Sequence, residues 1–270
     1  MIPVVERAIG LFERIGDRRA LAALHSTLAF IYGMFGRFAE ADALAERAET
    51  LMTDEGMRDS LVYAGFLNNR AGLRTEEGRL AEARADVVAA AAIAAGKDRY
   101  YFVSRCLPRL MTVELADGNP RRAIELAEEM LASEFGDSKE VRSSALEALT
   151  FMHLQLDEVD AAAAAARELL DAAPRDAAPW CHLAAIVALR GETAAAAQLL
   201  GFIDALYAQT LLPRRGLERR SYELLRTRLR GLLEESAIVA LAADGSLLTT
   251  EEAGTIAMRA LADPRSAYEL

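Results

Sequence analysis

One turn signal recurs five times along the 270-residue chain, and this internal repeat limits the fold more than any other feature. Each copy places a glycine, or once an aspartate, between two apolar and alanine-rich stretches. The turns lie at Gly36, Gly78, Gly118, Asp157 and Gly191, so successive copies are 42, 40, 39 and 34 residues apart. Periods of about 34 to 47 residues are typical of proteins built from repeated helix pairs. The pattern therefore predicts helix pairs that bury their apolar faces by stacking on their neighbours.

The composition favours an all-α fold. Alanine, the strongest helix former, supplies 55 of the 270 residues, and the strand-favouring Val, Ile and Thr are sparse by comparison. No apolar run is long enough to predict a transmembrane helix, and the N-terminus lacks the pattern of a signal peptide. We therefore expect a cytoplasmic protein whose two cysteines, Cys106 and Cys181, are buried thiols.

The repeats resemble the tetratricopeptide repeat, a family of antiparallel helix pairs. The first copy carries the small and large apolar positions of that family at Leu28, Ala29, Tyr32, Gly36, Phe38, Ala41, Ala45 and Ala48. The fifth copy has Trp180, the single tryptophan of the chain, where the family pattern asks for one. The second and third copies are looser, and Arg70 and Arg74 occupy positions that are usually apolar.

This resemblance implies a right-handed superhelix of about five helix pairs with capping helices. On that basis residues 1–16 form a partial pair, residues 17–211 the five repeats, and residues 212–270 the C-terminal capping helices. The segment Val4–Ile15 has the pattern of an amphipathic helix without an earlier partner. We expect it either to form a homodimer or to follow further residues in a longer native chain.

The C-terminal segment resembles the closing part of bacterial signalling ATPases of the STAND class. The similarity rests on Leu233-Glu234-Glu235, the alanine-rich stretch 237–243, Asp244-Gly245 and the run Thr249–Ala253 before an apolar helix. Thr249 or Thr250 is also a suitable N-cap for that helix. Proteins of this class join an output module and an ATPase core to a C-terminal tetratricopeptide sensor. The resemblance implies covalently linked ATPase and output domains, the output being a transcription factor or a nucleotide cyclase.

The sequence lacks the motifs of several well-known active sites. It has no phosphate-binding P-loop, no dinucleotide-binding glycine pattern, no His-Glu-x-x-His and no nucleophile elbow. Cys181 and His182 are neighbours on a predicted helix and face different directions, which makes them a poor pair of metal ligands. We therefore predict a chain without enzymatic activity, cofactor or metal.

Tetratricopeptide arrays bind partners on a concave surface lined by the first helix of each pair. In the present register this groove takes Phe30, Met34, Asn68, Asn69, Arg105, Arg109, Phe151 and Gln155. Arg105 and Arg109 are four residues apart and should share a helix face, where two guanidinium groups could hold a carboxylate or a phosphate. The alternative is an ordinary pair of surface arginines.

A second candidate surface breaks the acidic character of the chain. The formal net charge is −10, which argues against a protein that grips nucleic acid by its phosphates. Residues 214–230 nevertheless hold seven arginines and two glutamates. This second basic surface comprises Arg214, Arg215, Arg219, Arg220 and Arg226. It could bind an acidic partner or nucleic acid, or it could be a solvated helix face.

Taken together, these features favour a non-catalytic repeat domain for protein–protein interaction or for sensing a small inducer. The expected setting is the C-terminal regulatory part of a bacterial signalling ATPase or transcriptional regulator. A stand-alone adaptor that binds peptides in its groove is the first alternative. A helical repeat that binds nucleic acid through residues 214–230 is less favoured, because the chain as a whole is acidic.

Overall fold

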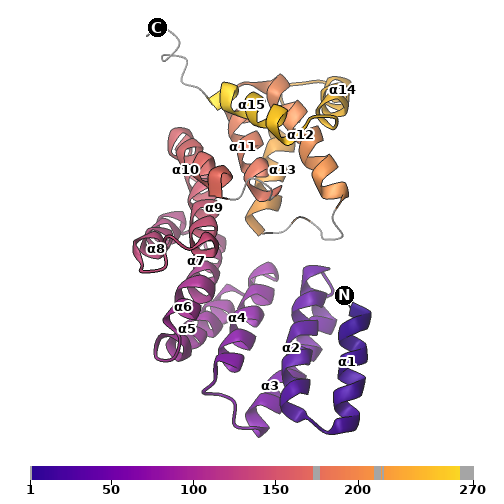
Figure 1. Cartoon of the computed structure of the whole chain (residues 1–270), viewed down its shortest axis with the longest axis vertical. Coiled ribbons are helices and arrows are strands. Elements are labelled where there is room, and N and C mark those ends of the chain that lie inside the picture. Colours follow the sequence, from indigo (N-terminus) through magenta and orange to yellow (C-terminus); the bar gives the residue numbers. More distant parts are fainter. Residues whose placement is uncertain (1, 173–176, 210–213, 215, 262–270) are drawn as a thin grey trace. The chain divides into compact units, whose positions relative to one another are not determined.

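The computed structural model describes residues 2–172, 177–209, 214 and 216–261. Within these ranges the chain is all-α, without a strand, which confirms the predicted fold class. None of the described helices is both long and apolar enough to cross a membrane. The helices labelled in Figure 1 are α1 (Ile2–Ile15), α2 (Arg18–Met34), α3 (Phe38–Asp54), α4 (Leu61–Glu76), α5 (Leu80–Ala95), α6 (Arg99–Tyr101), α7 (Leu107–Ala116), α8 (Pro120–Ala132), α9 (Lys139–Gln155), α10 (Val159–Ala172), α11 (Ala177–Leu189), α12 (Thr193–Ala208), α13 (Gly216–Arg230), α14 (Glu235–Gly245) and α15 (Thr250–Leu261). A short π-helix, η1 (Phe102–Cys106), joins α6 to α7.

The helices form two compact units, Met1–Gly136 and Asp137–Leu270. In the first unit α2 packs on α3, α4 on α5 and α7 on α8; in the second unit α9 packs on α10 and α11 on α12. These are the five predicted helix pairs, and the packing of neighbouring helices within each unit is compatible with a helical repeat solenoid. The boundary between the units falls between the third and fourth pairs, inside the stretch that the sequence assigned to one array.

The five repeated turns share one backbone geometry. Their φ angles are positive, with 73° at Gly36, 77° at Gly78, 80° at Gly118, 59° at Asp157 and 87° at Gly191. In each turn the next backbone N–H donates to the carbonyl five residues earlier, as Glu158 does to His153 at 2.9 Å. This is the Schellman pattern that ends a helix. Among the described residues Asp157 alone has a positive φ without being glycine, and aspartate tolerates that conformation better than most residues. The predicted equivalence of the five turns is thus confirmed.

Side-chain caps mark where the first helices of the pairs begin. The residues before α2, α4, α6 and α9 accept a hydrogen bond from the backbone N–H three residues on, and they are Asp17, Ser60, Asp98 and Ser138. At α15, Thr249 and Glu252 form a reciprocal capping box, so Thr249 is the N-cap of the two threonines that the sequence proposed. These caps satisfy N–H groups that the first turn of a helix leaves without partners.

Glycines set the close approach between the first helices of unit 1. The Leu73 side chain lies over Gly33, the Tyr101 hydroxyl lies beside Gly65, and the Arg109 guanidinium lies against Gly72. A Cβ at Gly72 would stand 2.6 Å from the Arg109 Cζ. Glycine inside a helix lowers stability by about 0.5–1 kcal/mol relative to alanine. The close contacts of Gly65 and Gly72 explain why α4 carries glycine at these positions despite that loss.

The π-helix η1 sets the spacing of the two residues that contact the glycines of α4. Pro108 has no N–H, and its ring crowds the carbonyl four residues earlier, which disturbs the turn before it. Leu107 N–H instead donates to the Phe102 carbonyl, five residues back. A turn of this kind adds one residue. Tyr101 and Arg109, eight positions apart, can therefore meet Gly65 and Gly72, which are seven positions apart.

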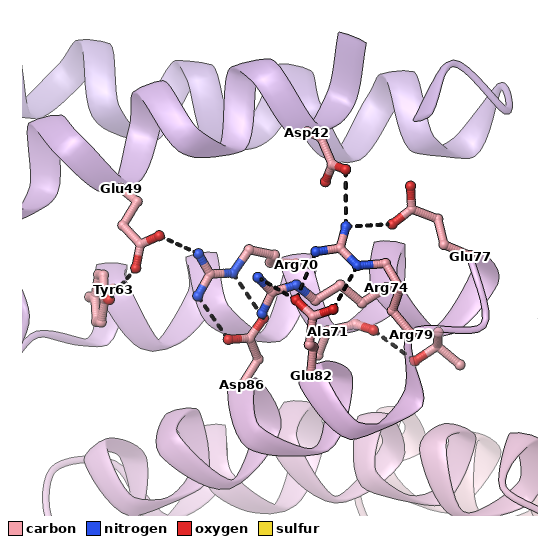
Figure 2. A network of polar contacts seen from close by, with 11 residues as sticks. Asp42, Glu49, Tyr63, Arg70, Ala71, Arg74, Glu77, Arg79, Glu82 and Asp86 are labelled. Carbon is pink, nitrogen blue, oxygen red and sulfur yellow. Dashed lines mark hydrogen bonds and ion pairs between the residues drawn. The ribbon is translucent and has the colours of Figure 1, made fainter. Parts of the chain in front are cut away.

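An ion network joins α3, α4 and α5, as Figure 2 shows. Two nitrogens of Arg70 donate to Asp86, each at 2.8 Å, and Arg74 Nη1 donates to the same carboxylate at 2.6 Å. Arg70 also donates to Glu49, whose carboxylate accepts from the Tyr63 hydroxyl at 3.0 Å. The Asp86 side chain is only 6% exposed. Arg70 and Arg74 can stand at positions that are usually apolar because Asp86 pairs with both of them, while Glu49 and Glu82 each supply a further carboxylate.

The core of unit 2 surrounds α11. Trp180 is 2% exposed, and its ring meets the edge of Phe202 with the centroids 5.0 Å apart. Its burial agrees with the place that the repeat pattern gives it. At the end of α15, Arg167 and Arg190 donate to the Leu261 carbonyl. Cationic side chains suit a helix C-terminus, so this contact fastens α15 to α10 and α11.

Helices α12 and α14 pack closely where they cross, because each places a glycine against the backbone of the other. A Cβ at Gly201 would stand 1.8 Å from the Ala242 carbonyl oxygen, and a Cβ at Gly245 would stand 1.9 Å from that of Gln198. Both obstructing atoms belong to backbone, which cannot turn aside as a flexible side chain can. The two helices could not keep this distance with any other residue at either position.

Replacing Gly201 should therefore destabilise unit 2. We expect Gly201→Ala to lower the free energy of unfolding by about 2–3 kcal/mol, because α14 must move away from α12. Gly254→Ala is the matched control, since its new Cβ would lie 3.9 Å from Trp180, an ordinary contact distance. Urea denaturation of both variants makes the comparison, and equal stabilities would show that the crossing is not as close as described.

Removing Asp86 should leave two largely buried arginines with only their more exposed partners, Glu49 for Arg70 and Glu82 for Arg74. We expect Asp86→Ala to cost about 3–5 kcal/mol of stability, the loss typical when one partner leaves a buried ion pair. Glu125→Ala, which breaks an exposed pair with Arg122, should change stability far less. The triple variant Arg70→Met, Arg74→Leu, Asp86→Leu should recover most of the loss, because an apolar set replaces the charges. Denaturant unfolding of the four proteins tests this, and a harmless Asp86→Ala would contradict it.

Candidate partner-binding surfaces

The first helices of unit 1 present four of the predicted groove residues at their surface. Phe30 and Met34 lie half-buried on α2, Asn69 lies half-buried on α4, and Arg105 is exposed in η1. We call these four residues the helix-A face. Phe30 and Asn69 also line a crevice of about 10 Å³ with Arg70. This volume is far below the roughly 300 Å³ of the smallest ordinary ligand pockets. Here the helix-A face can offer a partner a contact surface, but not an enclosed site.

The two predicted arginines of this surface differ in their surroundings. Arg105 is exposed, whereas Arg109 is half-buried with its guanidinium against Gly72 of α4. Arg105 lies inside the widened turn of η1 and Arg109 follows it, so the four-residue spacing rule of a regular α-helix does not carry over. Arg109 therefore contributes to helix packing, and Arg105 is the better placed of the two to meet a partner.

Two predicted groove residues are buried and are corrected here. Asn68 is 7% exposed and lies on the inner side of α4, so it cannot contact a partner. Phe151 is 2% exposed and faces the ring of His182 at a centroid distance of 6.5 Å, within the core of unit 2. Gln155 is exposed at the end of α9, also in unit 2. The sequence pattern located the first helices correctly but did not separate their inner and outer faces.

The Arg214 side chain is bound by other residues of unit 2. Its Nη2 donates to Asp204 Oδ1 at 2.6 Å, and its guanidinium lies between the rings of Tyr207 and Tyr222, 4.1 and 4.0 Å from their centroids. Tyr222 donates from its hydroxyl to the same Asp204 oxygen at 2.7 Å. Burial, together with this hydrogen bond, raises the pKa of Tyr222 to about 12. Arg214 thus stabilises the packing of α12 and α13. Arg215, predicted for the same surface, lies outside the described residues.

The other predicted arginines of the basic surface divide between two sides of α13. Arg219 and Arg226 flank the side that carries Tyr222, and Arg219 has Glu223 within 3.8 Å. Arg220 precedes Arg226 by six residues, which places it roughly 120° away around the helix. Ser221, Leu225 and Leu229 form the buried side between these flanks. The arginines that the structure describes within residues 214–230 do not therefore make one continuous basic face.

A buried serine–histidine contact in unit 2 serves packing. Ser221 Oγ and His182 Nδ1 are 2.7 Å apart, and His182 Nε2 lies 3.8 Å from Glu147 Oε1. These are residue types found in hydrolase triads. Ser221 and His182 are both fully buried, however, so this serine cannot meet a substrate. The contact instead ties α11 to α13 and α9.

Both cysteines are free and buried, as predicted. Burial raises the pKa of Cys106 to about 11 and that of Cys181 to about 12. A thiol with such a pKa is almost wholly protonated at neutral pH and is a weak nucleophile. Among the residues that the structure describes, no three His, Cys, Asp or Glu side chains are grouped so as to hold a metal ion.

Sequence reasoning missed the contacts that set the geometry of the helix-A face. These are the contacts of Gly65 with Tyr101 and of Gly72 with Arg109, and the ion network around Asp86. One signal was available, since two glycines seven residues apart inside a predicted helix indicate a side that a neighbour approaches closely. Comparison with models of known families and with curated proteins found no match for this sequence. The tetratricopeptide and STAND resemblances therefore stay sequence-based predictions.

Proposed function

We propose that this chain is a non-catalytic helical repeat domain that binds a protein partner through the helix-A face of unit 1. The observation that carries this proposal is the set of glycine contacts between first helices. Gly33, Gly65 and Gly72 let α2, α4 and the segment from α6 to α7 approach closely. Such packing brings Phe30, Met34, Asn69 and Arg105 onto neighbouring helices, where one partner can contact several of them.

The chemistry of the helix-A face fits a polypeptide. It combines an aromatic ring, a thioether, an amide and an exposed guanidinium, a mixture found at the centres of protein interfaces. Methionine adapts to different partner shapes, and a guanidinium can bind a carboxylate through two hydrogen bonds. A small inducer would need an enclosed cavity, and the crevice of about 10 Å³ between Phe30 and Asn69 does not supply one. We therefore favour a protein partner over an inducer at this face.

The wider setting follows from the sequence resemblances. A domain of this kind would act as the regulatory part of a signalling ATPase, with the partner controlling linked ATPase and output domains. A stand-alone adaptor would use the same face, so the interaction itself is the function to test first. The predicted homodimer through α1 is a separate proposal, supported by Val4, Leu11 and Ile15, which are exposed on that helix.

Charge reversal on the helix-A face should weaken partner binding without unfolding the chain. Peptides would first be selected from a displayed random library on the wild-type protein. We expect Arg105→Glu to reduce their affinity by about tenfold or more, since a carboxylate that met Arg105 would then be repelled. Arg109→Ala is less useful here, because its packing on Gly72 would be lost as well.

Arg122→Glu supplies the matched control. Arg122 is exposed on α8 in the same unit and pairs only with the exposed Glu125 among the described residues. The selected peptides should bind this variant as tightly as wild type, and both variants should keep the wild-type melting temperature. Equal losses for Arg105→Glu and Arg122→Glu, or selected peptides that ignore both changes, would refute binding at the helix-A face.

A further inference from the structure

A groove in unit 2 lies between α12, α13 and α14. Its volume is about 210 Å³, and its floor is apolar, formed by Leu200, Leu229 and Ile238, which are 5%, 0% and 7% exposed. Val239 stands on the α14 side and is 60% exposed, a large value for an aliphatic side chain beside an apolar floor. The Gly201–Gly245 crossing fixes α14 against α12. The walls of the groove are therefore held by backbone contacts.

The groove is charged on its α13 side. Arg226 lines it, exposed to solvent, with its Cζ 5.9 Å from the Tyr222 ring centroid. Asp204 also lines it, but that carboxylate already accepts from Arg214 and from Tyr222. At the rim, Arg230 and Glu235 form an exposed pair at 3.5 Å. Within the described part of the chain, Arg226 has no carboxylate at ion-pair distance. The groove thus offers one uncompensated guanidinium above an apolar floor.

The dimensions and the charge select the occupant. A volume of about 210 Å³ is below the roughly 300–1,000 Å³ of ordinary small-molecule pockets, but it suits an anchoring side chain of a peptide. An anchor in an apolar pocket with a charged rim is the usual centre of a protein interface. We propose that this groove binds an acidic amphipathic segment of a partner protein. An aliphatic side chain of that segment covers Leu229 and Ile238, and its carboxylate pairs with Arg226.

This site is separate from the helix-A face, and its test uses methyl signals in nuclear magnetic resonance. The full chain would carry labelled Ile, Leu and Val methyl groups, and two probe peptides would be titrated into it. One is an amphipathic peptide of leucine and glutamate; the other has lysine in place of every glutamate. We expect the acidic peptide to shift the signals of Ile238 and Val239, and the basic peptide to leave them unmoved.

Two charge reversals locate the contact. Arg226→Glu should reduce the affinity for the acidic peptide by about tenfold or more and should allow the basic peptide to bind instead. Arg228→Glu is the control, because Arg228 is exposed on the same helix and does not line the groove. It should leave both titrations as in wild type. Arg105→Glu, in unit 1, should also have no effect, which separates this test from that of the helix-A face.

Four outcomes would overturn the proposal. The first is an acidic peptide that leaves Ile238 and Val239 unmoved. The second is a basic peptide that shifts them equally. The third is a loss of affinity for the acidic peptide in Arg228→Glu as large as that in Arg226→Glu, which would indicate a general effect of charge. The fourth is a duplex DNA or RNA oligonucleotide that shifts these signals in place of the peptide, with the salt dependence of phosphate binding.

Discussion

A helix pair with one apolar side cannot bury that side alone, and the rest of this structure depends on how neighbouring pairs meet that constraint. The turn within each pair is fixed first, because a residue with positive φ at Gly36, Gly78, Gly118, Asp157 and Gly191 ends one helix and directs the chain back. What differs from place to place is the contact between neighbouring helices, whether within one pair or between one pair and the next. Glycine against a large side chain, ions around Asp86, and glycine against backbone are three solutions in one chain.

These solutions have different consequences for function. The glycine contacts of α4 bring first helices close and leave their outer sides available, whereas the Asp86 network holds both of its arginines in ion pairs inside the fold. The same distinction holds at α13, where Arg214 is held by Asp204 and two tyrosine rings while Arg226 has no carboxylate at ion-pair distance among the described residues. Positive charge in the sequence therefore does not by itself locate a binding surface. The surroundings of each guanidinium decide whether it stabilises the fold or can meet a ligand.

Much of the fold could be predicted because its signals are local. A turn of fixed geometry favours a glycine or aspartate, and an N-cap favours a serine, threonine or aspartate, so the five turns could be placed from the sequence and the last cap to within Thr249 or Thr250. The faces of the helices could not be placed as well. Phe151 and Asn68 were assigned to a surface and are buried, because their neighbours come from other helices. The π-helix at Phe102–Cys106 also shifted Arg109 relative to Arg105, which regular helical spacing does not anticipate.

The arginines at 70 and 74 show how a departure from a repeat pattern can be interpreted. In the sequence they weakened the second repeat, because a charge at an apolar position usually means a wrong register. In the structure they identify the register, since Asp86 on the paired helix lies where both guanidinium groups can reach it. A buried carboxylate with two arginines is costly unless all three groups are present, so one member implies the others. When a repeat shows a charge where others are apolar, the paired helix should be searched for its counter-charge before the register is abandoned.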